Sequence, residues 1–127
     1  MTREDKQLLL VDLSARLPYG VKMNHIADDK YQPDILIGVA KDMITLQNSS
    51  GYNTADVEDY KPYLFPLLSM TEEQKNVYHS FYADILRGLI TPANSVKLVD
   101  WLNAHHFDFR NLISRGLAID CTNLNIY

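Results

Sequence analysis

The sequence has a single cysteine, Cys121, which excludes both an intramolecular disulfide bond and a four-cysteine zinc site. It also lacks a long hydrophobic run near its start, where the apolar stretch Leu8-Leu9-Leu10-Val11 is far too short to cross a bilayer. Nor is there an excess of positive charge, because 16 acidic residues face 12 basic ones and the net charge is −4. The basic surface typical of nucleic-acid-binding proteins is therefore not expected.

What the sequence does contain is an ordinary globular composition, with 46% hydrophobic and 22% charged residues among its 127. A chain of this length and composition can form a packed core without disulfides or metal. Its charged start, residues 1–6, lacks the apolar stretch of a signal peptide. We therefore expect one domain spanning residues 1–127, in a cytoplasmic protein with no membrane segment, no cofactor and no metal.

The N-terminal part carries signals for a helix and then for strands. Thr2 and Asp5 have the spacing of a capping box, and the leucines that follow lie on one helical stripe. This pattern predicts a helix over residues 3–16. From residue 21 to 47 apolar and polar residues alternate, and Lys41-Asp42 offers a tight turn. The alternation predicts an antiparallel meander of three strands.

The middle of the chain has the pattern of irregular structure. Residues 48–53, Asn-Ser-Ser-Gly-Tyr-Asn, are the strongest loop signal in the sequence. Pro62 and Pro66 follow, and proline cannot donate a backbone hydrogen bond to a neighbouring strand. A continuous helix or a central strand is therefore not expected, and we predict a loop and an extended linker.

The last part has the pattern of helices. Thr71 and Gln74 form a capping box before an apolar stripe that ends at Gly88, and Thr91-Pro92 starts a second helix that ends near His105. A third, short helix is expected over residues 109–114. The predicted fold class is therefore α+β, divided into an N-terminal helix (1–18), a three-stranded β-meander (21–47), a loop and linker (48–70), a cluster of two to three helices (71–115) and a tail (116–127).

The densest group of polar and aromatic side chains lies within residues 100–111; its candidate binding residues are Trp101, His105, His106, Asp108 and Arg110. A His/Asp centre at 105–108 would suit acid–base catalysis. Zinc needs at least three protein ligands, so a metal site would also require a distant residue such as His25 or His79.

A structural role accounts for the same residues. Asp108 is placed to cap the short helix that follows it, and a histidine near a helix C-terminus can bind the last carbonyls. Trp101 would then pack against the preceding helix. A third interpretation is a binding surface, because Trp and Arg are common among the residues that dominate protein interfaces.

Tyrosines are frequent around the predicted loop, and Tyr60 and Tyr63 are further candidate binding residues. Tyrosine rings can stack on RNA bases, but Asp56, Glu58 and Asp59 nearby would repel phosphate. A protein interface fits these tyrosines better, because their rings are apolar and their hydroxyl groups are polar.

Several segments, in this order, resemble a family of small uncharacterised proteins of gut Bacteroides and related bacteria, often found in phage or prophage regions. They are Ala15–Val21, Asp59–Leu64, Ser69–Glu73, Trp101–Arg110 and Gly116–Ala118. The resemblance covers nearly the whole chain and implies a bacterial or phage cytoplasmic setting, with no catalytic residues to transfer. The segment after Cys121 lacks the lysine-rich end of that family, which leaves its role open.

These observations favour a phage or mobile-element accessory protein that binds another protein and is not an enzyme. The expected surface combines residues 48–66 with 101–110, and it should carry an exposed apolar patch rimmed by polar groups. A small enzyme with a His/Asp centre and a nucleic-acid-binding accessory protein are the alternatives. An exposed sheet edge would also allow a homodimer.

Overall fold

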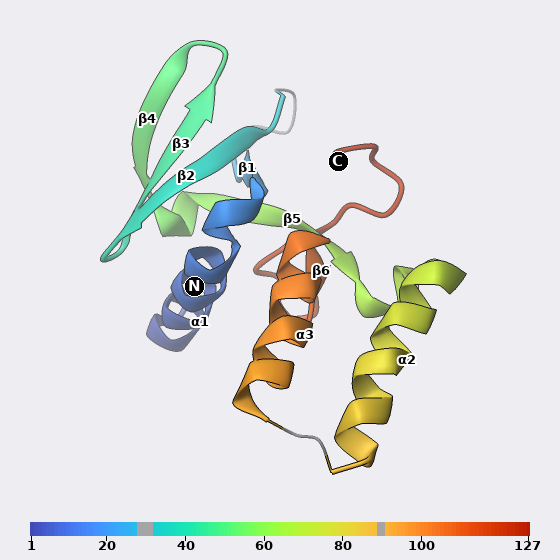
Figure 1. Cartoon of the computed structure of the whole chain (residues 1–127). Coiled ribbons are helices and arrows are strands. Elements are labelled where there is room, and N and C mark those ends of the chain that lie inside the picture. The colour runs from blue at the N-terminus through green and yellow to red at the C-terminus, as the bar shows by residue number, and fades with distance from the viewer. Residues whose placement is uncertain (28–31, 89–90) are drawn as a thin grey trace.

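The computed structural model describes residues 1–27, 32–88 and 91–127 (Figure 1). Its helices are α1 (Arg3–Arg16), α2 (Glu72–Leu86) and α3 (Pro92–Ala104), with short 3-10 turns η1 (Leu17–Tyr19), η2 (Val57–Asp59) and η3 (Leu67–Ser69). Its strands are β1 (Lys22–His25), β2 (Asp34–Ala40), β3 (Met43–Asn48), β4 (Gly51–Asp56), β5 (Tyr60–Pro66), β6 (Phe107–Asp108) and β7 (Ile119–Asp120).

The strands form one mixed sheet in the order β4-β3-β2-β1-β5-β6, and β7 also pairs with β5. The pairs among β1 to β5 are antiparallel, whereas β6 and β7 run parallel to β5. The prediction of a three-stranded meander with a C-terminal helix cluster is therefore wrong. Residues 21–47 do form three of the strands, but β1 lies inside a larger sheet, with β5 on its other side.

The predicted N-terminal helix is confirmed as α1. The Asp5 amide donates to Thr2 Oγ1 at 3.1 Å, and the Thr2 amide donates to Asp5 Oδ2 at 3.4 Å, which completes the capping box. Leu9 and Leu13 are fully buried in the main core, which the strands also line. Capping and one apolar stripe thus fix both the start of α1 and the face that it buries.

The predicted loop at residues 48–53 is instead part of a hairpin. β3 and β4 pair in continuous register from Met43↔Asp56 to Asn48↔Gly51, and only Ser49 and Ser50 make the turn. Asn48 Oδ1 accepts the Ser50 amide at 2.8 Å and so supports this turn. The local composition of β4 is that of a loop, but the adjacent β3 supplies the hydrogen bonds that make it a strand.

The predicted linker is extended, but the expectation that no central strand forms here is wrong, because Pro62 and Pro66 lie within strand β5, which pairs on both sides. The Ile26 amide donates to the Asp59 carbonyl at 2.8 Å, which makes 26/59 a hydrogen-bonded pair. Hydrogen-bonded and non-hydrogen-bonded pairs alternate along an antiparallel ladder, so the pair Met23↔Pro62 is a non-hydrogen-bonded one. The nitrogen of Pro62 therefore faces away from β1, and the ladder needs no donor from it.

The two later helices begin where the sequence predicts. Thr71 and Gln74 exchange the two capping-box hydrogen bonds, at 2.9 and 3.2 Å, and the Asn94 amide donates to Thr91 Oγ1 at 3.2 Å. The third helix, expected over 109–114, is wrong: these residues form turns. Asp108 still caps them, because its carboxylate accepts the first amides that the turns leave free.

Buried side chains form two clusters. The larger one lies between α1 and the sheet and includes Leu9, Leu13, Met23, Leu46 and Leu64. The smaller one contains Met70, Leu102 of α3 and Phe107 of β6, and Phe65 of β5 packs against it. Figure 1 shows α2 and α3 side by side on one side of the molecule, away from the β3–β4 hairpin. Among the helices in the described ranges, none has the length and apolarity needed to cross a membrane.

Candidate functional site

The structure places Asp108 and Arg110 in the contact between α1 and the segment after α3. The Asp108 carboxylate, 7% exposed, accepts the amides of Leu112 and Ile113, both at 2.9 Å. Arg110 Nε lies 3.3 Å from Asp12 Oδ1, and Asp12 is fully buried. Both side chains therefore hold the backbone after α3 in place, in agreement with the structural interpretation of Asp108.

Asp12 also binds a second guanidinium, that of Arg16, and both residues are fully buried. Arg16 donates to the Asp12 carboxylate at 2.7 and 3.2 Å and to the Phe107 carbonyl at 2.7 Å. The Phe109 ring lies 5.5 Å from the Arg16 guanidinium and 4.9 Å from that of Arg110. The hydrogen bonds of Arg16 Nε and Nη2 fasten α1 to β6, whereas Arg16 Nη1 is buried without a hydrogen-bond partner in the described structure.

Trp101 and His105 belong to an aromatic group on the small core. The Trp101 ring centroid lies 5.7 Å from that of Phe107 and 4.7 Å from that of His105. His105 is exposed, and its Nδ1 lies 2.9 Å from the Trp101 carbonyl oxygen at the C-terminal end of α3. This is the carbonyl-binding role that a histidine takes near a helix C-terminus.

His106 follows α3 with a positive φ of 61°, and its ring stacks on Tyr127 with centroids 3.7 Å apart. Burial, together with the positive charges of Arg16, His105 and Lys22, lowers the pKa of His106 to about 4. The imidazole is therefore neutral near pH 7. His105, His106 and Asp108 thus have separate partners, and the structure does not bring their side chains together in one pocket.

Tyr63 contributes its backbone to an unexpected contact with Tyr127. The Tyr127 hydroxyl accepts the Lys22 amide at 2.8 Å and donates to the Tyr63 carbonyl at 2.9 Å. In the register of the β1–β5 ladder, Lys22 and Tyr63 would form the next hydrogen-bonded pair. The Tyr127 hydroxyl therefore takes the place of a direct backbone bond where the two strands separate. The Lys22 ammonium also donates to the Ile126 carbonyl at 2.6 Å. These contacts fix the last residues of the tail against the sheet.

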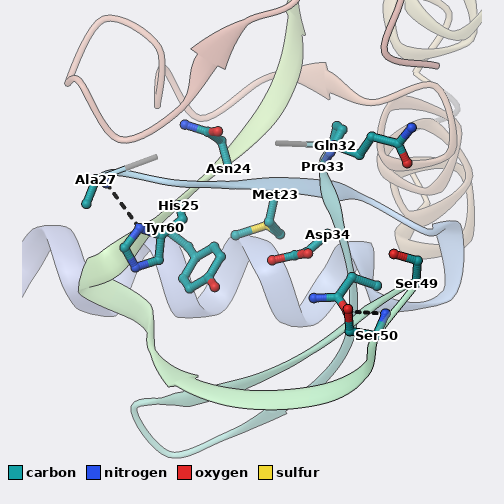
Figure 2. A pocket seen from close by; sticks show the side chains of 11 residues that line it. Met23, Asn24, His25, Ala27, Gln32, Pro33, Asp34, Ser49, Ser50 and Tyr60 are labelled. Carbon is teal, nitrogen blue, oxygen red and sulfur yellow. Dashed lines mark hydrogen bonds between the residues drawn. The ribbon is translucent and has the colours of Figure 1, made fainter. Parts of the chain in front are cut away.

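The remaining predicted site residue, Tyr60, lies at a cleft of about 550 Å³ at one end of the curled sheet (Figure 2). Strand ends and turns bring its walls together from separate parts of the sequence. The described residues that line it are Met23, Asn24, His25, Ala27, Gln32, Pro33, Asp34, Asn48, Ser49, Ser50 and Tyr60. The first half of the predicted surface, residues 48–66, thus contributes to this cleft, and the second half, 101–110, does not.

Tyr60 and Asp34 lie next to each other in the cleft wall, Tyr60 buried and Asp34 half-buried. Tyr60 is only 4% exposed, and its hydroxyl interacts with the side chains of Asn53 and Asp34. Burial and the negative charge of Asp34 raise the pKa of Tyr60, although the bond from Asn53 opposes the change. The phenol therefore stays protonated. Figure 2 shows Tyr60 and Asp34 projecting into the same space below Met23.

His25 and the β3–β4 turn supply hydrogen-bond donors to the cleft. His25 Nδ1 accepts the Ala27 amide at 3.1 Å, which leaves Nε2 as the ring nitrogen that can donate a hydrogen bond. The His25 ring meets the Tyr60 ring edge-on, with centroids 5.0 Å apart. Asn48 Oδ1 is bonded to the Ser50 amide, which leaves the NH₂ group of Asn48 as a donor.

The described residues that line the cleft carry a negative charge. Asp34 is the one acidic residue among the described lining residues, and none of these is lysine or arginine. The protein as a whole carries a net charge of −4. A carboxylate beside an aromatic wall, with neutral donors around it, suits a positively charged or hydroxyl-rich group.

Other surfaces fit the sequence predictions less well. Within residues 48–66 and 101–110, Tyr52 is the one exposed large apolar residue; the others lie elsewhere and include Met43, Leu68, Tyr82, Leu86 and Tyr127. No group of three or more His, Cys, Asp or Glu side chains in the described ranges is arranged to hold a metal ion. Cys121 is buried, and burial together with the nearby Asp120 raises its pKa to about 11.

Sequence reasoning named Tyr60 but missed His25 and Asp34 as its neighbours. These three residues lie at the ends of different strands, and only the register Met23↔Asp34 and His25↔Tyr60 brings them together. No local spacing carries that information. In the comparisons with known proteins, no family model, no curated protein and no solved structure matches this chain.

Proposed function

We propose that this protein is a small binding module, not an enzyme, that acts by docking on another protein and holds a basic side chain of that partner in the Tyr60–Asp34 cleft. A bacterial or phage cytoplasmic setting, implied by the family that the sequence resembles, is part of the same proposal. The observation that carries it is the buried Tyr60 beside the Asp34 carboxylate, in a cleft whose described lining contains no lysine or arginine to neutralise that charge.

The chemistry favours arginine or lysine over other side chains. A carboxylate accepts hydrogen bonds from a guanidinium or an ammonium group, and such charge-assisted bonds are stronger than neutral ones. The aromatic rings of Tyr60 and His25 offer apolar contact to the methylene groups of a long basic side chain. The net charge of −4 would attract a basic partner over longer distances.

A peptide titration tests this proposal. We expect a short acetylated and amidated peptide, Gly-Arg-Gly, to shift the NMR signals of His25, Asp34 and Tyr60 with a dissociation constant on the order of 1 mM, since one side chain gives little affinity. The matched peptide with citrulline has nearly the same shape without the charge. It should bind at least about tenfold more weakly, which corresponds to the loss of one charge-assisted bond.

The variant Asp34→Asn provides the matched control on the protein, because it removes the charge and keeps the size. It should lose the preference for arginine over citrulline while the rest of the spectrum stays unchanged. Equal binding of the two peptides to the wild-type protein would contradict the proposal. So would signal changes confined to residues outside the cleft.

A further inference from the structure

The outer edge of β4 carries a second inference, independent of the cleft. β4 pairs with β3 along its whole length, and within the described ranges no strand pairs with its other side. Figure 1 shows β4 at the outer margin of the sheet, beyond β3. Its outer edge therefore presents backbone donors and acceptors that the described chain does not use for strand pairing.

One hydrogen bond identifies which groups face outward. The Val57 amide donates to the Asp42 carbonyl at 3.2 Å, so 42/57 is a hydrogen-bonded pair of the β3–β4 ladder. Pairs alternate along an antiparallel ladder, and the register is unbroken from Met43↔Asp56 to Asn48↔Gly51. Residues 51, 53 and 55 thus bond to β3, whereas the N–H and C=O groups of Tyr52, Thr54 and Asp56 point away from it.

This edge lacks the features that keep edge strands from pairing. Residues 51–55 contain no charged residue and no proline, and no bulge interrupts the β3–β4 register. Tyr52 is 73% exposed, and Thr54 is exposed on the same face of the strand. An exposed, regular edge whose one charged residue, Asp56, lies at its end is suited to accept another strand.

We infer that this edge pairs with β4 of a second copy of the chain, antiparallel and around a two-fold axis at Thr54. In that register Thr54 faces its own copy, and Tyr52 faces Asp56 of the second copy. All three outward-facing residues then both donate and accept, so the pairing uses the whole edge.

The charges of the edge are compatible with this arrangement. Asp56 already accepts the Glu58 amide at 2.9 Å and lies 3.4 Å from the Lys6 ammonium, so its charge is partly balanced within its own chain. In the two-fold register Glu58 falls opposite Ser50 of the second copy. No acidic residue therefore faces another acidic residue across the two-fold axis, so the pairing brings no like charges together.

Sedimentation equilibrium over a range of concentrations tests the inference. We expect the mass to rise from 14.6 kDa toward twice that value as concentration increases. Thr54→Lys puts two like charges opposite each other at the axis and should weaken association at least about tenfold. Gln47→Lys is the matched control, because Gln47 is exposed on the same face of the sheet but lies on the inner strand β3.

Amide exchange gives a readout that does not depend on a variant. The Tyr52 and Thr54 amides should become protected as concentration rises, whereas the Asn53 amide, bonded to β3, should be protected at every concentration. A protein that stays monomeric up to about 1 mM would overturn the inference, because functional dimers form well below that concentration. A dimer that Thr54→Lys leaves unchanged would also overturn it.

Discussion

The buried carboxylate of Asp108 allows the structural interpretation of the 101–110 segment to be tested quantitatively. Asp108→Ala removes the acceptor for the amides of Leu112 and Ile113, both 2.9 Å away, and Leu112 is fully buried. A hydrogen bond to a charged group contributes roughly 1.5–3 kcal/mol, and the contributions of two bonds to one carboxylate do not simply add. We therefore expect the free energy of unfolding to fall by about 2–4 kcal/mol.

The assay is urea unfolding followed by circular dichroism, with the slope against urea compared between variants to confirm that the same transition is measured. Asp108→Asn is the matched control, since it keeps one acceptor oxygen and the size of the side chain, and it should lose about half as much stability. A change below about 0.5 kcal/mol for Asp108→Ala would refute the reasoning, since surface substitutions without a structural role stay within that range. The role of Asp108 would then have to be sought in binding or chemistry.

Two further predictions concern the contact between the tail and the sheet. The pKa of His106 is lowered to about 4 in the folded protein, against about 6.5 in the unfolded chain, so the stability contributed by neutral His106 should be fully present above pH 6.5 and fall between pH 6.5 and 4. Allowing for partial exposure of the ring, this loss of unfolding free energy is about 1–2 kcal/mol. His106→Asn should remove this part of the pH dependence, which urea titrations at several pH values would measure. Tyr127→Phe keeps the stacking on His106 but removes the hydroxyl that bonds the Lys22 amide and the Tyr63 carbonyl. It should lower the free energy of unfolding by about 1–3 kcal/mol and speed hydrogen exchange at the Lys22 amide. An unchanged exchange rate would contradict the bridging role.

The helices could be predicted because their signals are local. The capping pairs Thr2–Asp5 and Thr71–Gln74 and the Thr91 cap lie within a few residues of the helix starts that they fix. The third predicted helix failed for a related reason. Asp108 is an N-cap residue by its type and position, but the residues that it caps form turns. Asn111 has a positive φ of 60°, which a continuing α-helix would not allow.

The strands β4 and β5 could not be predicted, because they depend on neighbours that local composition does not reveal. β4 has the composition of a loop, and its pairing with β3 makes it a strand. Proline disrupts a strand only where its nitrogen, which cannot donate a hydrogen bond, faces a neighbouring strand. The register turns the nitrogen of Pro62 away from β1. The same dependence on register hid the cleft, since Asp34 and His25 meet Tyr60 only in the assembled sheet.

Strand β5 is where segments from distant parts of the sequence meet. It pairs with β1 along its first half, with Ile119–Asp120 in its middle and with Phe107–Asp108 at its end. During synthesis on the ribosome, β5 would therefore leave the exit tunnel before two of its three neighbours do. Its aromatic and aliphatic side chains would stay uncovered for that interval, so a nascent chain stalled before residue 107 should be a better substrate for chaperones than the finished protein.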